Sequence, residues 1–264
     1  MYVTVNQTHY WVEVAGTGQP LVLLHGFTGS HRTWEGLSWP GIKTIMVDLP
    51  GHGCTKVERE SPLTMEECCQ ELMQLFQHLH LDSFYLLGYS LGGRTALSYA
   101  LLYPEKVKGI VLESASPGLN TLQEREERQQ KDERIAAMLE SEGIGKFVDF
   151  WENLPLFDTQ KAMPRAKQAK IRQERLWQDA EGLAFSLRGM GTGRQPSWWE
   201  SLNELSHPFL LIAGEQDQKF LGIGQAMEER FRHAYLEVVP SAGHAVHVEK
   251  PDIFAKIVSD FVIQ

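Results

Sequence analysis

The stretch Phe84-Tyr85-Leu86-Leu87-Gly88-Tyr89-Ser90-Leu91-Gly92-Gly93 joins an apolar run to a G-x-S-x-G pentapeptide. The apolar run predicts a strand, and the helix-forming residues from Gly93 to Leu102 predict a helix that ends before Pro104. A strand, a G-x-S-x-G turn and a helix in this order indicate a nucleophile elbow, which is a strained turn that presents a serine hydroxyl. Glycines suit the turn because the strand and the helix must approach each other closely.

Outward from the elbow, unbroken apolar runs alternate with helix-length segments, which predicts a mostly parallel sheet covered by helices on both faces. Helices are expected from the capping box Thr64-x-x-Glu67 to about Leu79 and from about Asp252 to Val262. The expected strands are 21–24, 44–48, 84–88, 109–112, 209–214 and 235–239.

Strand-like runs are absent from about residue 120 to residue 200, and charged amphipathic stretches take their place. Thr121-x-x-Glu124 is a second capping box, while Gly143 and Pro155 are expected to break helices. We interpret residues 118–202 as a helical cap inserted into a core of residues 1–117 and 203–264. The cap is expected to be too interrupted for a hydrophobic core of its own.

A serine nucleophile needs a base within hydrogen-bonding reach and an acid that orients this base. In this architecture the chain order is Ser, then Asp or Glu, then His, at the carboxyl ends of strands. Asp217 and His244 fit that order best, and Glu215 with His247 is the alternative pair. His25 and His52 precede Ser90 in the chain, so each is expected to hold a loop instead.

An oxyanion hole needs two N–H donors that point at developing negative charge. The amide of Leu91 follows the nucleophile directly, at the start of a helix. The second donor is expected from His25-Gly26-Phe27-Thr28-Gly29, and we select the amide of Phe27.

Composition excludes several classes of protein. The chain has 264 residues, 42% of them hydrophobic, with 25 Lys and Arg against 34 Asp and Glu. A net charge of −9 disfavours a surface for nucleic acid or anionic membranes. No apolar run reaches the roughly 18 residues of a membrane span, the N-terminus lacks a signal-peptide pattern, and the three cysteines form no disulfide or zinc pattern. We therefore expect a cytoplasmic protein, either a monomer or a small homo-oligomer.

Five motifs together resemble the α/β-hydrolase family with a cap, and the resemblance spans nearly the whole chain. This implies the α/β-hydrolase fold and a Ser90–Asp217–His244 triad, although the fold alone leaves the reaction open. The motifs are His25-Gly26-Phe27-Thr28-Gly29, Asp48-Leu49-Pro50-Gly51-His52-Gly53, Gly88 to Gly93, Gly214-Glu215-Gln216-Asp217 and Ala242-Gly243-His244.

A finer resemblance, which includes cap sequence, is to the 2-succinyl-6-hydroxy-2,4-cyclohexadiene-1-carboxylate synthase family of menaquinone biosynthesis. It implies a lyase that eliminates pyruvate from a tricarboxylate precursor with no metal or organic cofactor. The segments that carry it are Tyr89 to Arg94, Ser116 to Leu119, Arg128 to Asp132, Gly191 to Trp199 and Asp217 to Phe220.

The same resemblance implies a set of substrate-binding residues. Arginine suits the carboxylates because its planar fork donates two parallel hydrogen bonds. Trp198 and Trp199 are expected to fasten the cap to the core. The alternative functions are a serine hydrolase of small esters or C–C bonds, and a non-catalytic receptor, which the complete triad disfavours. The implied binding residues are Arg94, Arg128, Arg175, Lys219, Tyr89 and Trp151.

Overall fold

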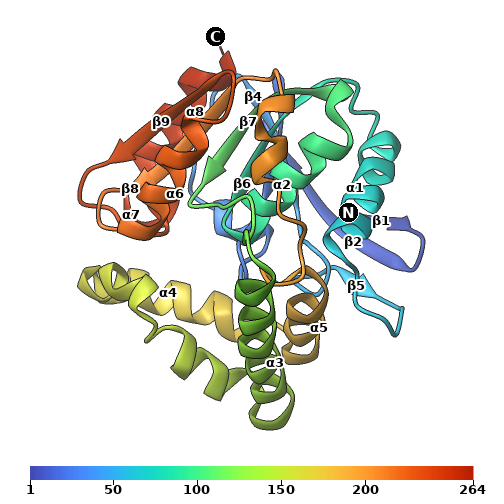
Figure 1. Cartoon of the computed structure of the whole chain (residues 1–264), viewed down its shortest axis with the longest axis vertical. Coiled ribbons are helices and arrows are strands. Elements are labelled where there is room, and N and C mark those ends of the chain that lie inside the picture. Colours follow the sequence, from blue (N-terminus) through green and yellow to red (C-terminus); the bar gives the residue numbers. More distant parts are fainter. Residues whose placement is uncertain (264) are drawn as a thin grey trace.

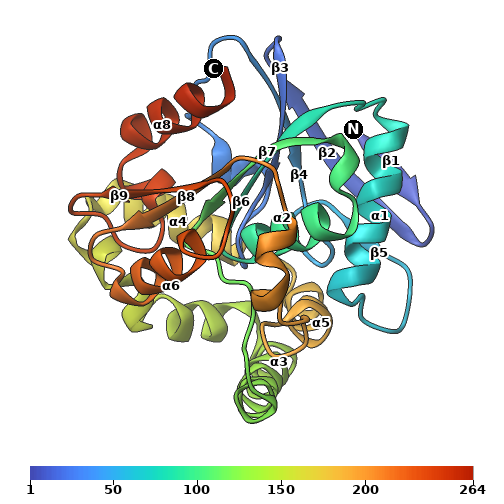
Figure 2. The same ribbon diagram turned by 45° about the horizontal axis from the view of Figure 1, so that its top comes forward.

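A computed structural model describes residues 1–263, so the last residue of the expected core range, Gln264, lies outside the described residues. Within that range nine strands form one sheet in the order β1-β2-β4-β3-β6-β7-β8-β9, with β5 paired to β2 (Figures 1 and 2). The pairings from β4 through β3 to β9 are all parallel. The strands are β1 Tyr2–Val5, β2 Thr8–Ala15, β3 Gln19–Leu24, β4 Ile42–Val47, β5 Lys56–Val57, β6 Phe84–Tyr89, β7 Val107–Glu113, β8 Phe209–Gly214 and β9 Ala234–Val239.

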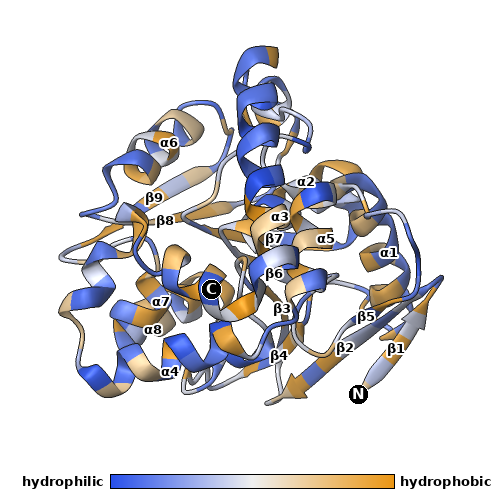
Figure 3. Cartoon of the chain, turned by 90° about the horizontal axis from the view of Figure 1, so that it is seen from below, coloured by the Kyte–Doolittle hydropathy of each residue, from blue (hydrophilic) through white to orange (hydrophobic). Residues whose placement is uncertain are grey.

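Helices cover both faces of this sheet, and the hydrophobic residues gather on the strands between them (Figure 3). One face packs against α1, α2 and α6, and the opposite face packs against α7 and α8. The helices are α1 Met65–His78, α2 Leu91–Leu102, α3 Leu122–Trp151, α4 Arg165–Leu176, α5 Ala180–Met190, α6 Gln218–Glu228, α7 Val246–Glu249 and α8 Pro251–Ile263. None of these helices is long and apolar enough to cross a membrane.

The chain between β7 and β8 contains helices and no strand among its described residues, and it forms a separate layer at the bottom of Figure 1. Gly143 interrupts α3 with a φ of 78°, which agrees with the expected break. Seven buried residues from α3 and α5 form a small cluster here, and Phe27 of the core packs against it. The expectation that this segment has no hydrophobic core of its own was therefore wrong.

The six strands and both capping boxes expected from the sequence are present, but β1, β2 and β5 were not expected. β2 pairs antiparallel with β1 and β4 near the edge of the sheet, and from Thr8 to Val12 its residues alternate between buried and partly buried. An unbroken apolar run is typical of a strand that is buried on both faces, so that pattern does not predict a strand such as β2.

Candidate active site

Ser90 lies in the sharp turn between β6 and α2. Its backbone has φ 49° and ψ −104°, a strained left-handed conformation for a residue with a side chain. The Ser90 amide donates to the carbonyl of Glu113 at 2.9 Å, and its own carbonyl accepts from the amide of Arg94 at 2.9 Å. A methyl group at Gly92 would overlap the carbonyl of Leu24, so the turn requires glycine there. The elbow expected from the sequence is thus present.

Asp217 and His244 meet Ser90 at the carboxyl end of the sheet. Nε2 of His244 lies 3.3 Å from Oγ of Ser90, and Nδ1 of His244 lies 2.7 Å from Oδ2 of Asp217. The other oxygen of Asp217 accepts from the amide of Phe220 at 3.2 Å, which fixes the carboxylate at the start of α6. His244 and Asp217 are buried, and the ring of Phe220 lies 4.6 Å from that of His244. These contacts favour one orientation of the imidazole.

The alternative pair, Glu215 and His247, does not meet Ser90. Glu215 accepts a hydrogen bond from the amide of Ser241 at 2.8 Å, on the loop after β9. Nδ1 of His247 lies 2.8 Å from a carboxylate oxygen of Glu113 at the end of β7. The structure therefore brings Asp217 and His244, and not the alternative pair, to the serine hydroxyl.

His25 and His52 hold loops, as expected. Nε2 of His25 accepts from the amide of Leu49 at 3.0 Å, and its Nδ1 donates to the carbonyl of Gly26 at 2.8 Å. Nδ1 of His52 lies 3.1 Å from the carbonyl of Pro50, and its ring lies 5.4 Å from that of Phe27. Burial, together with nearby His25, lowers the pKa of His52 to about 3.

This depressed pKa predicts a specific acid sensitivity. The unfolded chain protonates His52 near its ordinary value of 6.5, whereas the folded protein keeps it neutral down to about 3. Above pH 6.5 His52 is neutral in both states, and its protonation costs the fold no stability. As the pH falls from 6.5 toward 3, only the unfolded chain takes up this proton, so the free energy of unfolding decreases by about 1.4 kcal/mol per pH unit. In urea titrations at pH 7 to 4.5, the unfolding free energy of His52→Gln should fall less steeply than that of the wild type.

The exposed His78 at the end of α1 supplies the control for this comparison, because its substitution removes one imidazole from the surface and leaves His52 in place. His78→Gln should retain the wild-type dependence on pH. Equal slopes for His52→Gln and the wild type would contradict the assignment of this acid sensitivity to His52.

The amides of Phe27 and Leu91 both lie at the wall of the Ser90 cavity. Leu91 is the first residue of α2, where a backbone N–H has no partner inside the helix. Phe27 follows β3, and its ring contacts His52, Phe147 and Trp151. Among residues 1–263, neither amide donates a hydrogen bond to another group. Each amide thus belongs to a residue of the cavity wall and has no acceptor within residues 1–263.

The cavity above Ser90 has a volume of about 190 Å³ and lies between the sheet and the α3–α5 layer. The apolar part of its wall includes Phe27, Trp151, Leu156, Phe157 and Phe220. Five of the six substrate-binding residues expected from the resemblance line it, namely Tyr89, Arg94, Arg128, Trp151 and Lys219. Arg175 is the exception.

Arg94 is the most deeply buried cation of this cavity. Its Nη1 donates to the carbonyl of Met190 at 2.8 Å and to the side-chain oxygen of Gln195. Both acceptors are uncharged, so they orient the guanidinium without neutralising it. Burial, followed by the positive charge of Arg128, lowers the pKa of Arg94 to about 9. A bound carboxylate would relieve both effects.

Arg128 and Lys219 add positive charge to the cavity from two further helices. Arg128 on α3 donates through Nε to Asp132 at 2.8 Å, which leaves the two Nη groups of its guanidinium for another acceptor. Lys219 lies in the first turn of α6, and burial followed by the charge of Arg128 lowers its pKa. The three cations come from different elements, so the cavity concentrates positive charge within an acidic protein.

Arg175 on α4 lines a neighbouring hollow together with Thr33, Glu174 and His247. Its Nη2 donates to Oε1 of Gln160 at 3.0 Å, and its guanidinium lies 4.5 Å from the ring centre of Phe157. Phe27, Tyr89 and Phe157 line both this hollow and the Ser90 cavity. Arg175 is therefore close to the candidate site but is separated from Ser90 by aromatic rings.

Trp198 and Trp199 were expected to fasten the cap to the core, and both contact core elements: Trp198 bonds to α2, and the ring of Trp199 packs against the main core cluster. Nε1 of Trp198 donates to Ser98 on α2 at 2.9 Å, and Nε1 of Trp199 donates to the carbonyl of Gly118 at 3.0 Å. Neither ring lines the Ser90 cavity.

Sequence reasoning did not single out Glu249 on α7. Its carboxylate accepts from the amide of Gly243, next to His244, at 2.8 Å and from Thr159 Oγ1 of the α3–α5 layer at 3.0 Å. Glu249 thus supports the loop that carries the imidazole. Its spacing of five residues from His244 is the only local signal that links the two.

The sheet, the elbow and the Ser90–His244–Asp217 geometry are those of a hydrolase-type fold. A model of the alpha/beta hydrolase fold family matches residues 19–251. The chain therefore belongs to the α/β-hydrolase family.

Within that family, the chain is similar to a particular group of enzymes. It is 43% identical to the putative 2-succinyl-6-hydroxy-2,4-cyclohexadiene-1-carboxylate synthase of Bacillus subtilis strain 168, over 95% of this chain and 92% of the relative. It is 32% identical to the synthase of the same name from Salmonella newport strain SL254, over 89% and 91% of the two chains. The solved structure of MenH from S. aureus matches with a TM-score of 0.88 and 33% identity, over 97% and 98%.

Proposed function

We propose that this protein is a 2-succinyl-6-hydroxy-2,4-cyclohexadiene-1-carboxylate synthase. It would eliminate pyruvate from 2-succinyl-5-enolpyruvyl-6-hydroxy-3-cyclohexene-1-carboxylate. The observation that carries the proposal is one cavity in which Ser90 and His244 lie beside three cations from three helices. A substrate with three carboxylates requires such a concentration of positive charge, and simple esters do not.

In this proposal Ser90, Asp217 and His244 perform proton transfer and form no acyl-enzyme. Ser90 Oγ passes its proton to Nε2 of His244 and removes the ring proton next to the succinyl ketone. Asp217 holds Nδ1–H of His244 at 2.7 Å and stabilises the imidazolium that results. The electron pair released from carbon then moves through the ring alkene and breaks the C–O bond. Pyruvate leaves as its enolate and takes up a proton.

The amides of Phe27 and Leu91 would stabilise the charge that develops on the ketone oxygen. An enolate oxygen needs the same donors as the tetrahedral oxyanion of an esterase. A donor of this kind is worth about 3 kcal/mol in the transition state. The position of Leu91 at the start of α2 adds the partial positive charge of the helix end.

The cations would bind the carboxylates of the precursor. Arg94, Arg128 and Lys219 line the cavity directly, and Tyr89 and Trp151 supply part of its aromatic wall. Arg175 would act from the adjacent hollow, where its guanidinium is held by Gln160 and Phe157. Residues 118–202 would serve as a cap over the core of residues 1–117 and 203–264.

The direct test is incubation of the purified protein with the enolpyruvyl precursor in buffer without added metal or cofactor. Pyruvate, followed with lactate dehydrogenase and NADH, should appear in amounts equal to the precursor consumed. The proposal would be overturned if the precursor remained intact although a fluorophosphonate reacted fully with Ser90 of the same protein sample.

The second candidate is a serine hydrolase of small esters or C–C bonds, which the strained elbow and the 3.3 Å contact between Ser90 and His244 also suit. A burst of acyl-enzyme with an activated ester, together with no activity on the precursor, would favour it. Labelling of Ser90 by a fluorophosphonate separates both candidates from a non-catalytic receptor, because an unactivated serine does not react.

A further inference from the structure

A second buried carboxylate–imidazole pair lies beside Asp217 and His244. Glu113 at the end of β7 accepts from the backbone amide of His247 at 3.0 Å, and both its carboxylate oxygens lie within 2.9 Å of Nδ1 of the His247 ring. Glu113 and His247 are 134 residues apart in sequence and almost fully buried. Neither residue lines the Ser90 cavity, so the pair has no direct route to a substrate there.

Tyr89 connects this pair to the candidate site. Its ring lies 4.6 Å from the ring of His247 on one side and 5.3 Å from the ring of His244 on another. The same ring lies so close to Gly26 that a methyl group at residue 26 would collide with it. Tyr89 is therefore held between His247, the imidazole that contacts Ser90, and the loop that carries the amide of Phe27.

Glu113 also reaches the elbow through its main chain. Its carbonyl accepts the amide of Ser90 at 2.9 Å, while its carboxylate holds the start of α7 through the amide of His247. Trp34 and Phe254 enclose the other surfaces of the His247 ring, at 5.1 Å and 5.8 Å. Glu113 thus joins β7 to the turn that carries Ser90 through its main-chain carbonyl, and to the helix that follows His244 through its carboxylate.

We infer that Glu113 and His247 are positioning residues for the reaction, acting through the ring of Tyr89. The pair fixes Tyr89, and Tyr89 in turn fixes both the His244 imidazole and the Phe27 loop around the serine hydroxyl. This inference rests on the proposed function, in which Ser90 and His244 are the reacting groups.

The test compares His247→Gln and Glu113→Gln with the wild type in three measurements. These are the rate constant for fluorophosphonate labelling of Ser90, the kcat and KM for pyruvate release, and the thermal midpoint. Labelling and kcat should fall by about tenfold to a hundredfold, because displacements near 1 Å from remote changes have effects of this size. KM should stay within about threefold for Glu113→Gln, because that side chain lines neither the Ser90 cavity nor the hollow that holds Arg175, whereas His247 lines the hollow.

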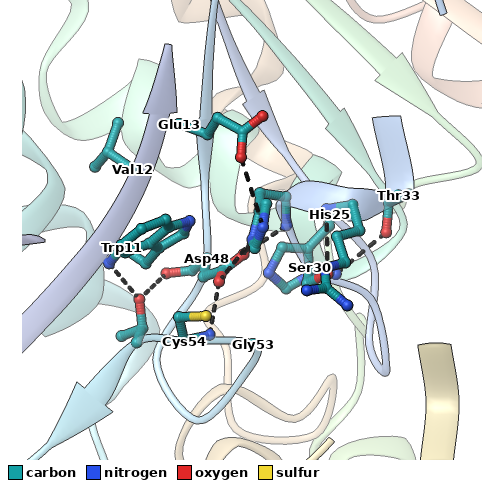
Figure 4. A network of polar contacts seen from close by, with 12 residues as sticks. Trp11, Val12, Glu13, His25, Ser30, Thr33, Asp48, Gly53 and Cys54 are labelled. Carbon is teal, nitrogen blue, oxygen red and sulfur yellow. Dashed lines mark hydrogen bonds and ion pairs between the residues drawn. The ribbon is translucent and has the colours of Figure 1, made fainter. Parts of the chain in front are cut away.

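The chain supplies a matched control in the pair of His31 and Asp48. Figure 4 shows the network of polar contacts to which Asp48 belongs. Nδ1 of His31 lies 2.9 Å and 3.0 Å from the two oxygens of Asp48, and the His31 amide also donates to that carboxylate. Both residues are buried, but the His31 ring contacts Trp11 and Trp177 rather than Tyr89. His31→Gln should lower the thermal midpoint and leave the labelling rate within about twofold of the wild type.

A double-mutant cycle tests the route through Tyr89 and remains informative where the buried-pair variants fold poorly. Tyr89→Leu, at the cavity wall, should itself lower labelling at least about tenfold. Adding His247→Gln to Tyr89→Leu should then change labelling by less than about twofold, since coupled residues are non-additive. A full additional loss would overturn the inference, as would wild-type labelling in Tyr89→Leu.

The outcomes also separate this inference from the proposed function. Folded His247→Gln and Glu113→Gln variants that label and turn over at wild-type rates would overturn the inference alone. A wild-type protein that labels at Ser90 but releases no pyruvate would overturn the proposed reaction alone, and reduced labelling in the variants would still support the positioning role.

Discussion

Ser90→Ala should lower the rate of pyruvate release by at least about 10²–10⁴-fold, which is the range that a positioned acid–base group contributes. The hydroxyl is the group that would remove the ring proton, and its distance of 3.3 Å from Nε2 of His244 is that of the long hydrogen bond common in free enzymes, which tightens when substrate binds. Stability should change little, because the hydroxyl is only partly buried and makes this one side-chain contact in the described part of the chain. The measurements are single-turnover pyruvate release and thermal unfolding.

Ser141→Ala is the control for this substitution, because Ser141 is an exposed residue of α3 whose hydroxyl donates to the carbonyl of Ala137 in its own helix. It should retain wild-type turnover. Conversion of the precursor at the wild-type rate by a folded Ser90→Ala protein would show that the proton is removed by another group.

Arg94→Met should reduce kcat/KM for the precursor by at least about 30-fold, because a buried carboxylate that loses its charged partner costs about 2–5 kcal/mol. Methionine keeps the apolar part of the side chain in place, so the fold should remain intact. The acceptors left behind, Met190 and Gln195, are uncharged, which limits the penalty in the free protein. Steady-state kinetics together with the thermal midpoint check both statements.

Two comparisons show whether Arg94 acts on substrate charge. Arg134→Met removes an exposed arginine of α3 and should leave kcat/KM unchanged. A neutral ester analogue should be turned over equally by the wild type and Arg94→Met. An equal loss on the analogue and on the precursor would mean that the substitution damages the site in general, which contradicts carboxylate recognition.

Most of the fold could be predicted because the strands that carry the site are buried on both faces. Runs such as Leu21 to Leu24 and Phe209 to Gly214 are apolar throughout, and each leads directly to a motif. β1, β2 and β5 were not expected because none of them is an unbroken run of buried residues: β1 and β5 are mostly exposed or partly buried, and β2 is buried at every second residue only from Thr8 to Val12. For β2 the alternation of Thr8, Tyr10 and Val12 was the available signal.

The arrangement of Ser90, Asp217 and His244 was predictable since each follows a strand end, and parallel strands bring those ends to one edge. Arg175 was expected with the other cations, but the way α4 packs places it in the adjacent hollow. That packing depends on contacts between distant segments, such as Thr33 with Glu174. Glu113 and His247 are likewise 134 residues apart, and no sequence motif links them. Their pairing could therefore not be predicted from the sequence.

The crowded backbone at the elbow also sets where this protein can change by mutation. Added methyl groups at Gly88 or Gly92 would meet main-chain atoms, which have no room to yield. Libraries that randomise these positions should return glycine almost exclusively. Variants with altered substrate preference are instead expected from α3 and α5, whose side chains form cavity wall without carrying the turn. Directed evolution of new chemistry on this scaffold would therefore begin in residues 119–192 and leave the serine loop untouched.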